Sequence, residues 1–88
     1  MENRILQKKE QLAELAGELY VIVSNNYDGY DQMEDDSIKV VAFSDRIRIV
    51  NVEYDIMLTL NGEYASEEVE FDVTMNIINE AFAMVNAQ

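Results

Sequence analysis

The chain has 88 residues, enough for one hydrophobic core, so we expect a single domain spanning residues 1–88. Its 18 acidic and 6 basic side chains give a formal net charge of −12, which argues strongly against direct contact with nucleic acid, because binding to phosphates requires Lys and Arg. The absence of both His and Cys excludes disulfides, most catalytic triads and zinc sites, and we therefore expect no enzymatic activity, no cofactor and no metal centre.

Residues 3–24 are predicted to form the first helix, with Asn3 as its N-cap. Apolar side chains recur there at spacings of three, four and seven residues and form one stripe: Ile5, Leu12, Leu15, Leu19 and Ile22. The longest apolar run, residues 19–23, is far shorter than the ~20 residues that a membrane-spanning helix needs, and residues 1–10 do not resemble a signal peptide. We therefore expect a cytoplasmic protein that does not contact membranes.

An acidic loop is predicted over residues 25–37. It contains carboxylates and aromatic rings close together: Asp28, Asp31, Glu34, Asp35 and Asp36, with Tyr27 and Tyr30 among them. Tyrosine beside carboxylates suits a contact surface, because each ring offers apolar area, a polar tip and few rotamers. The plainer interpretation, in which these rings fold back on the core, stays open.

The same stretch resembles a calcium-binding loop of the EF-hand type. With Gly29 at the sixth position, the ligand positions one, three, five, seven and twelve fall on Ser24, Asn26, Asp28, Tyr30 and Asp35. The first ligand is Ser where Asp is usual, the last is the shorter Asp, and a strand is predicted in place of the exit helix. A calcium-binding module is therefore the third interpretation of the chain.

Three strands are predicted next, over residues 38–43, 46–60 and 63–72, followed by a second helix over residues 73–87. The apolar phase of the second strand shifts near Asn51, where we expect a β-bulge or bend. This order predicts an α+β fold, helix–three-stranded antiparallel sheet–helix, with both helices on one face of the sheet and the opposite face in solvent.

Asn61-Gly62 predicts a two-residue type I′ turn between the last two strands. The register that follows brings carboxylates together on the solvent face: Glu53 opposite Glu70, Asp55 opposite Glu68, and Asp72 beside them. Like charges directly opposed are destabilising, and no Lys or Arg follows Arg48 to neutralise them. We interpret this cluster as a partner-binding acidic patch. The alternative is an ordinary solvated sheet face, although such a face normally mixes both signs of charge.

The chain as a whole resembles a class of small phage-encoded inhibitors, including anti-CRISPR proteins and other DNA mimics, which are often acidic, lack Cys and pack helices against a short antiparallel sheet. The shared feature is the set of carboxylates on the sheet and in the loop. The resemblance implies that the chain occupies the basic nucleic-acid groove of a partner, either a CRISPR effector or another host nuclease, and excludes nucleic acid by competition. In that interpretation Tyr27, Tyr30 and Tyr64 supply apolar contact area. The order of elements is also similar to the double-stranded-RNA-binding domain, but the basic contact surface of that domain is missing.

The second interpretation is a structural or assembly subunit. In that case the apolar stripes of the two helices remain partly exposed and build a homodimer or a larger complex. An oligomer that is stable in high salt, without affinity for basic proteins, distinguishes this interpretation from an electrostatic one.

Overall fold

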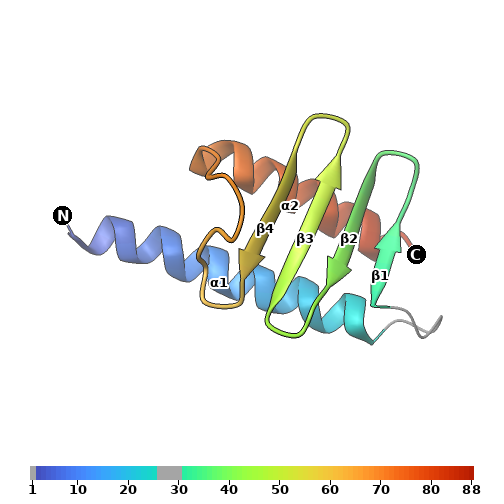
Figure 1. Cartoon of the computed structure of the whole chain (residues 1–88), viewed down its shortest axis with the longest axis horizontal. Coiled ribbons are helices and arrows are strands. Elements are labelled where there is room, and N and C mark those ends of the chain that lie inside the picture. Colours follow the sequence, from blue (N-terminus) through green and yellow to red (C-terminus); the bar gives the residue numbers. More distant parts are fainter. Residues whose placement is uncertain (1, 26–30) are drawn as a thin grey trace.

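The computed structural model describes residues 2–25 and 31–88, with side chains from Gln7 onward in those ranges. These residues form two helices and four strands, in the order α1 (Glu2–Ser24), β1 (Gln32–Glu34), β2 (Ile38–Ala42), β3 (Arg46–Asn51), β4 (Asp55–Thr59) and α2 (Phe71–Asn86). The strands form one antiparallel sheet in the order β1-β2-β3-β4, and both helices cover the same face of it and run in the same direction (Figure 1). The predicted α+β class is confirmed, but the sheet has four strands where three were predicted.

The core lies between the sheet and the two helices, because each element turns one apolar face inward. Every second side chain of the three longer strands is buried: Ile38, Val40 and Ala42 on β2, Ile47 and Ile49 on β3, and Ile56 and Leu58 on β4. The buried helix residues follow helical spacing: Leu12, Ala16, Leu19 and Val23 on α1, and Ile77, Ile78, Ala81, Met84 and Val85 on α2. Of the stripe predicted for the first helix, Leu15 and Ile22 are only partly buried.

The predicted strand over residues 46–60 is wrong in one respect, since it divides after Asn51 into β3 and β4. The side-chain oxygen of Asn51 accepts hydrogen bonds from the backbone N–H groups of Glu53 (2.9 Å) and Tyr54 (2.7 Å) and so builds a tight turn. The amide of Asn51 also donates to Glu80 of α2 at 3.0 Å, which ties the turn to the helix layer. The apolar phase shift therefore marks a hairpin turn and not a bulge, because an Asn side chain can replace backbone partners in a turn.

The short strand β1 lies in the segment that was predicted to be a loop. Met33 pairs with Val40 of β2 and packs against the core. The side chain of Gln88, beyond the end of α2, donates a hydrogen bond to the carbonyl oxygen of Glu34 at 2.9 Å. Three residues are too few for an alternating pattern to be recognised, so the sequence did not predict this strand.

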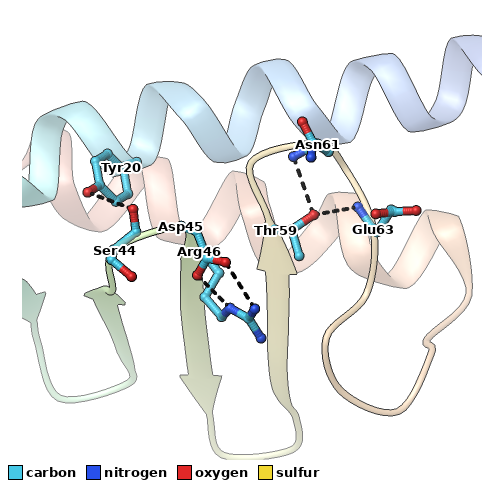
Figure 2. A network of polar contacts seen from close by, with 7 residues as sticks. All are labelled: Tyr20, Ser44, Asp45, Arg46, Thr59, Asn61 and Glu63. Carbon is cyan, nitrogen blue, oxygen red and sulfur yellow. Dashed lines mark hydrogen bonds and ion pairs between the residues drawn. The ribbon is translucent and has the colours of Figure 1, made fainter.

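The Asn61-Gly62 turn is present, but it is not of type I′. Among the described residues only Gly62 has a positive φ, 85°, whereas type I′ requires positive φ at both central positions. The hydroxyl of Thr59 closes the turn by accepting hydrogen bonds from the N–H groups of Asn61 (3.3 Å) and Glu63 (3.2 Å) (Figure 2). Gly62 itself is buried against α1, where a Cβ atom would overlap the carbonyl oxygen of Lys9. The turn therefore docks the end of β4 on α1.

This docked turn is joined to the turn between β2 and β3. The backbone N–H of Leu60 donates to the carbonyl oxygen of Asp45 at 3.1 Å. The hydroxyl of Tyr20 on α1 donates to the carbonyl oxygen of Ser44 at 3.4 Å, and Arg46 pairs with Asp45 (Figure 2). The end of the sheet that carries these two turns is therefore held on α1, whereas the turn between β3 and β4, at the opposite end, is held on α2.

The predicted strand over residues 63–72 is wrong. The segment runs back along β4 only through an isolated pairing of Leu58 with Tyr64, and the hydroxyl of Ser66 then accepts a hydrogen bond from a backbone N–H of β4 at 3.0 Å. A side chain thus takes the place of a backbone partner, which ends the pairing. The second helix begins at Phe71, earlier than the predicted start.

Candidate functional site

The solvent face of the sheet is not the acidic patch that the hairpin register predicted. The side chains of β2 and β3 that alternate with the buried ones include Lys39, Arg46 and Arg48, most of the cations whose side chains the structure describes. The guanidinium of Arg48 donates to both carboxylate oxygens of Asp55 on β4, with Nε 2.8 Å from Oδ1, and this hydrogen bonding lowers the pKa of Asp55. The predicted acidic face therefore carries paired and positive groups.

The four carboxylates of the predicted patch lie in separate settings. Asp55 is on the solvent face of β4, Glu53 is in the turn between β3 and β4, and Glu68 and Glu70 are in the irregular segment before α2. The predicted cross-strand pairs do not exist, because residues 63–72 do not form a strand that faces β4. The patch is thus a wrong prediction, and its cause is the register assumed for the Asn61-Gly62 turn.

Asp72, which was predicted to extend the patch, lies in the first turn of α2. The N-cap position belongs to Glu70, and no side chain caps this helix. A carboxylate in the first turn stabilises a helix by about 0.3–1 kcal/mol through the macrodipole. This role accounts for Asp72 without a partner protein.

Asp35 closes the turn between β1 and β2. Its Oδ1 atom accepts hydrogen bonds from the backbone N–H groups of Ser37 (2.8 Å) and Ile38 (3.0 Å), and from the hydroxyl of Ser37. These bonds, the Ser37 N–H foremost, lower the pKa of Asp35 because they favour the charged form. Asp35 therefore has a structural role that the sequence-based hypothesis did not include.

The other predicted contact residues differ in their surroundings. Exposed side chains near β1 are Asp31, Glu34 and Asp36, whereas Tyr27, Asp28 and Tyr30 lie outside the described residues. Tyr64 is half-buried, and its hydroxyl donates to the carbonyl oxygen of Val69 at 2.9 Å and contacts the hydroxyl of Thr74. The polar tip of Tyr64 is thus engaged within the fold, which does not fit the predicted contact role.

The calcium interpretation gains no support from the described part of the chain. Three of the ligand positions, Asn26, Asp28 and Tyr30, lie outside it. The carboxylate of Asp35 is occupied by the turn between β1 and β2. Within residues 2–25 and 31–88 no group of three acidic side chains comes together in a way that could hold a metal ion.

The prediction from the sequence did not include a row of carboxylates on α1. Glu10, Glu14 and Glu18 are exposed and follow one another at four-residue spacing, on the side of the helix opposite the buried Leu12 and Leu19. Like charges at this spacing destabilise a helix by about 0.2–0.5 kcal/mol per pair. The available signal was this spacing, together with the absence of Lys and Arg from residues 10–38. We call the side of α1 that carries these three residues the outer face of α1.

Four of the five described cations are engaged away from the outer face of α1, and the fifth, Lys39, lies on the solvent face of the sheet. Lys9 pairs with Glu63 at 3.3 Å, the ammonium of Lys8 lies 5.1 Å from the ring centre of Phe71, and both arginines of the sheet are paired. Exposed carboxylates that have no hydrogen-bond or ion-pair partner within the described ranges are Glu10, Glu14, Glu18, Asp31, Asp36, Glu53, Glu67, Glu68, Glu70 and Asp72. The negative charge of the chain is therefore largely uncompensated at its own surface.

Comparison with known proteins found no family model, no curated protein and no solved structure that matches the chain. In the described ranges, neither α1 nor α2 combines the length and the apolar character needed to cross a membrane.

Proposed function

We propose that this protein is an acidic binding protein that occupies the basic nucleic-acid-binding groove of a partner protein and excludes nucleic acid from it. One observation carries the proposal, the uncompensated carboxylates of the outer face of α1. Glu10, Glu14 and Glu18 repel one another, and none of the cations whose side chains are described pairs with them. A basic partner would relieve it, and the net charge of −12 would attract such a partner from a distance.

The helix gives this row of charges a regular and rigid form. Residues four apart on a helix are separated by about 6 Å along its axis, so the three carboxylates are evenly spaced. Because α1 is packed on the sheet through buried side chains, little order has to be gained on binding. A rigid line of negative groups is the feature that a phosphate-binding groove recognises. The partner class is accordingly a basic nucleic-acid-binding protein of the cytoplasm, such as a CRISPR effector or another host nuclease.

The first test is capture of partners from a bacterial lysate by the immobilised protein at low and at high salt. We expect basic nucleic-acid-binding proteins at low salt and their loss at high salt, because screening weakens exposed charge pairs. Added DNA should compete with the immobilised protein for the same partner. Capture that is unchanged by salt and by DNA would count against the proposal.

Charge reversal then locates the surface. Reversal of Glu10, Glu14 and Glu18 to Lys keeps the four-residue repulsion within α1 but changes its sign, and we expect it to abolish capture. Reversal of Asp31, Asp36 and Glu53 makes the same change in net charge on residues that the sequence predicted as contacts or as part of the acidic patch. Loss of capture in the second set alone would assign the contact to the turns, and retention in both sets would refute an electrostatic function.

The alternative of an assembly subunit requires apolar helix stripes that are free to associate. Within the described residues, Leu12, Leu19, Ile78 and Val85 of these stripes are instead buried in the core of the same chain, and Leu15, Ile22 and Phe82 are partly buried against it. Light scattering at low and high salt separates the two functions, because an assembly subunit stays oligomeric in high salt. A monomer under both conditions fits the binding function.

A further inference from the structure

A shallow groove lies on the helix side of the molecule, away from the sheet. It is lined by Glu14, Gly17, Glu18, Val21 and Ile22 of α1 and by Phe82 and Asn86 of α2. The lining is mainly apolar, and Val21 is 56% exposed although it is a β-branched hydrophobic residue. The apolar groove and the row of carboxylates thus share the outer face of α1.

Gly17 is the residue in this groove that the fold of the chain does not explain. A Cβ atom at this position would meet no atom within 4 Å, so the packing of the chain does not require glycine. Glycine in the interior of a helix is less stable than alanine, which makes its presence here a cost. The missing side chain leaves the backbone of α1 open to close approach from outside, one turn before exposed Val21.

The charges at the rim decide what fits the groove. Glu14 and Glu18 line it, and Glu10 lies one turn earlier on the same face. A second copy of this chain would bring the same glutamates against each other, in a molecule that already carries a net charge of −12. The complementary occupant has apolar side chains on one face and Lys or Arg on its flanks.

We infer that this groove receives one basic amphipathic helix of the partner, an inference that rests on the proposed function. The apolar face of that helix packs against Val21, Ile22 and Phe82. Its flanking Lys or Arg side chains reach Glu14 and Glu18. Binding of an amphipathic helix in an apolar groove of another protein is a recurring mode of recognition, in which residues of the helix spaced by three and four supply the contacts.

A pair of fluorescein-labelled synthetic peptides tests the inference. Both contain the same numbers of Leu and Lys; in one the Leu residues recur at three- and four-residue spacing, and in the other the order is scrambled. Fluorescence anisotropy at low salt should show that the amphipathic peptide binds at least about tenfold more tightly than the scrambled one. The difference reports the apolar groove, because net charge and composition are equal.

Substitution of Gly17 places a side chain in the groove without removing any contact of the fold. We expect Gly17→Leu to weaken the amphipathic peptide at least about tenfold, Gly17→Ala to weaken it less, and neither variant to change binding of the scrambled peptide. Circular dichroism checks that both variants keep the helical signal of the wild type. Weakened binding in variants that remain folded would support the groove as the contact.

The remaining outcomes separate this inference from the function on which it rests. If both peptides bind equally and Gly17→Leu alters neither, the groove is not used while the charge-based function stands. If neither peptide binds at low salt, both proposals fail. If light scattering shows a wild-type dimer that Gly17→Leu dissociates, a second copy occupies the groove and the inference is wrong.

Discussion

Replacement of Gly62 by Ala tests how the turn after β4 docks on α1. Gly62 has a φ of 85°, a conformation that costs a residue with a Cβ atom about 1–2 kcal/mol. The added methyl group would also overlap the carbonyl oxygen of Lys9 and lie 3.0 Å from the backbone nitrogen of Ala13. Both are backbone atoms of a helix and cannot rotate aside, so the turn must shift, which costs about 1–3 kcal/mol for an overpacked contact.

The two terms predict that Gly62→Ala lowers the free energy of unfolding by about 2–5 kcal/mol. Small domains have about 5–15 kcal/mol in total, so the variant should lose a large share of its stability. The measurement is urea unfolding at neutral pH, followed by the helical circular dichroism signal. The midpoint should fall while the slope with urea stays the same, since the surface exposed on unfolding is unchanged.

Two matched variants control this experiment. Asn61→Ala changes the exposed residue before Gly62. Because the φ of Asn61 is not positive, the free energy of unfolding of this variant should stay within about 0.5 kcal/mol of the wild-type value. Gly17→Ala, where a Cβ meets nothing within 4 Å, should raise the free energy of unfolding by about 1 kcal/mol. If Gly62→Ala costs no more than Asn61→Ala, the turn is not docked on α1 and the reasoning is refuted.

The other predictions use the same urea titration. Thr74 is fully buried, and Thr74→Val takes one hydrogen-bond partner from the hydroxyl of Tyr64, so we expect a loss of about 1–2 kcal/mol; an unchanged midpoint would contradict this contact. Asn51→Ala removes the side chain that builds the β3–β4 turn and ties it to α2, and should cost about 1–3 kcal/mol, whereas a loss below about 0.5 kcal/mol would show that the turn forms without it. The lowered pKa of Asp35 and of Asp55 means that their charged forms stabilise the fold at neutral pH and lose this effect as the pH falls below 3.8, their ordinary value. The difference in free energy of unfolding between the wild type and the double variant Asp35→Asn, Asp55→Asn should therefore be smaller in acid than at neutral pH. An equal difference at neutral pH and in acid would exclude the two charges as its source.

The long periodic elements of the fold were predictable because burial follows their spacing. The first helix ends at Ser24 as predicted, and β2 covers five of the six residues expected for it. The sheet was harder, because side chains replace backbone partners at its turns. Asn51 builds a turn within a run of β-formers, and Ser66 ends the pairing of the returning segment. A hydrogen bond made by one side chain leaves no periodic trace in a sequence, so the division of residues 46–60 and the loss of the last strand were missed.

The candidate site depended on register, which is the least local property of a sheet. The predicted patch required Asn61-Gly62 to form a two-residue turn, and every later pair followed from that assumption. Gly62 instead turns toward α1, a contact between parts of the chain that are distant in sequence. The carboxylates of the outer face of α1 needed no such assumption, since the four-residue spacing of Glu10, Glu14 and Glu18 is sufficient. The sequence therefore contained a more secure acidic surface than the one we predicted from it.

The distribution of charge differs from what solubility alone requires. A net charge of magnitude about 2–8 keeps a small domain soluble, and a surface that serves only solubility mixes both signs. Here Arg46 and Arg48 are paired on the sheet, while the charged side chains described on the outer face of α1 are all acidic, so the electric field of the molecule is uneven. Solubility also gives no reason to place Gly17 and exposed Val21 within that acidic row, because an apolar spot on a surface favours association. The proposed function, in which charge orients a basic partner and the apolar groove receives it, would explain both features on the same face of one helix.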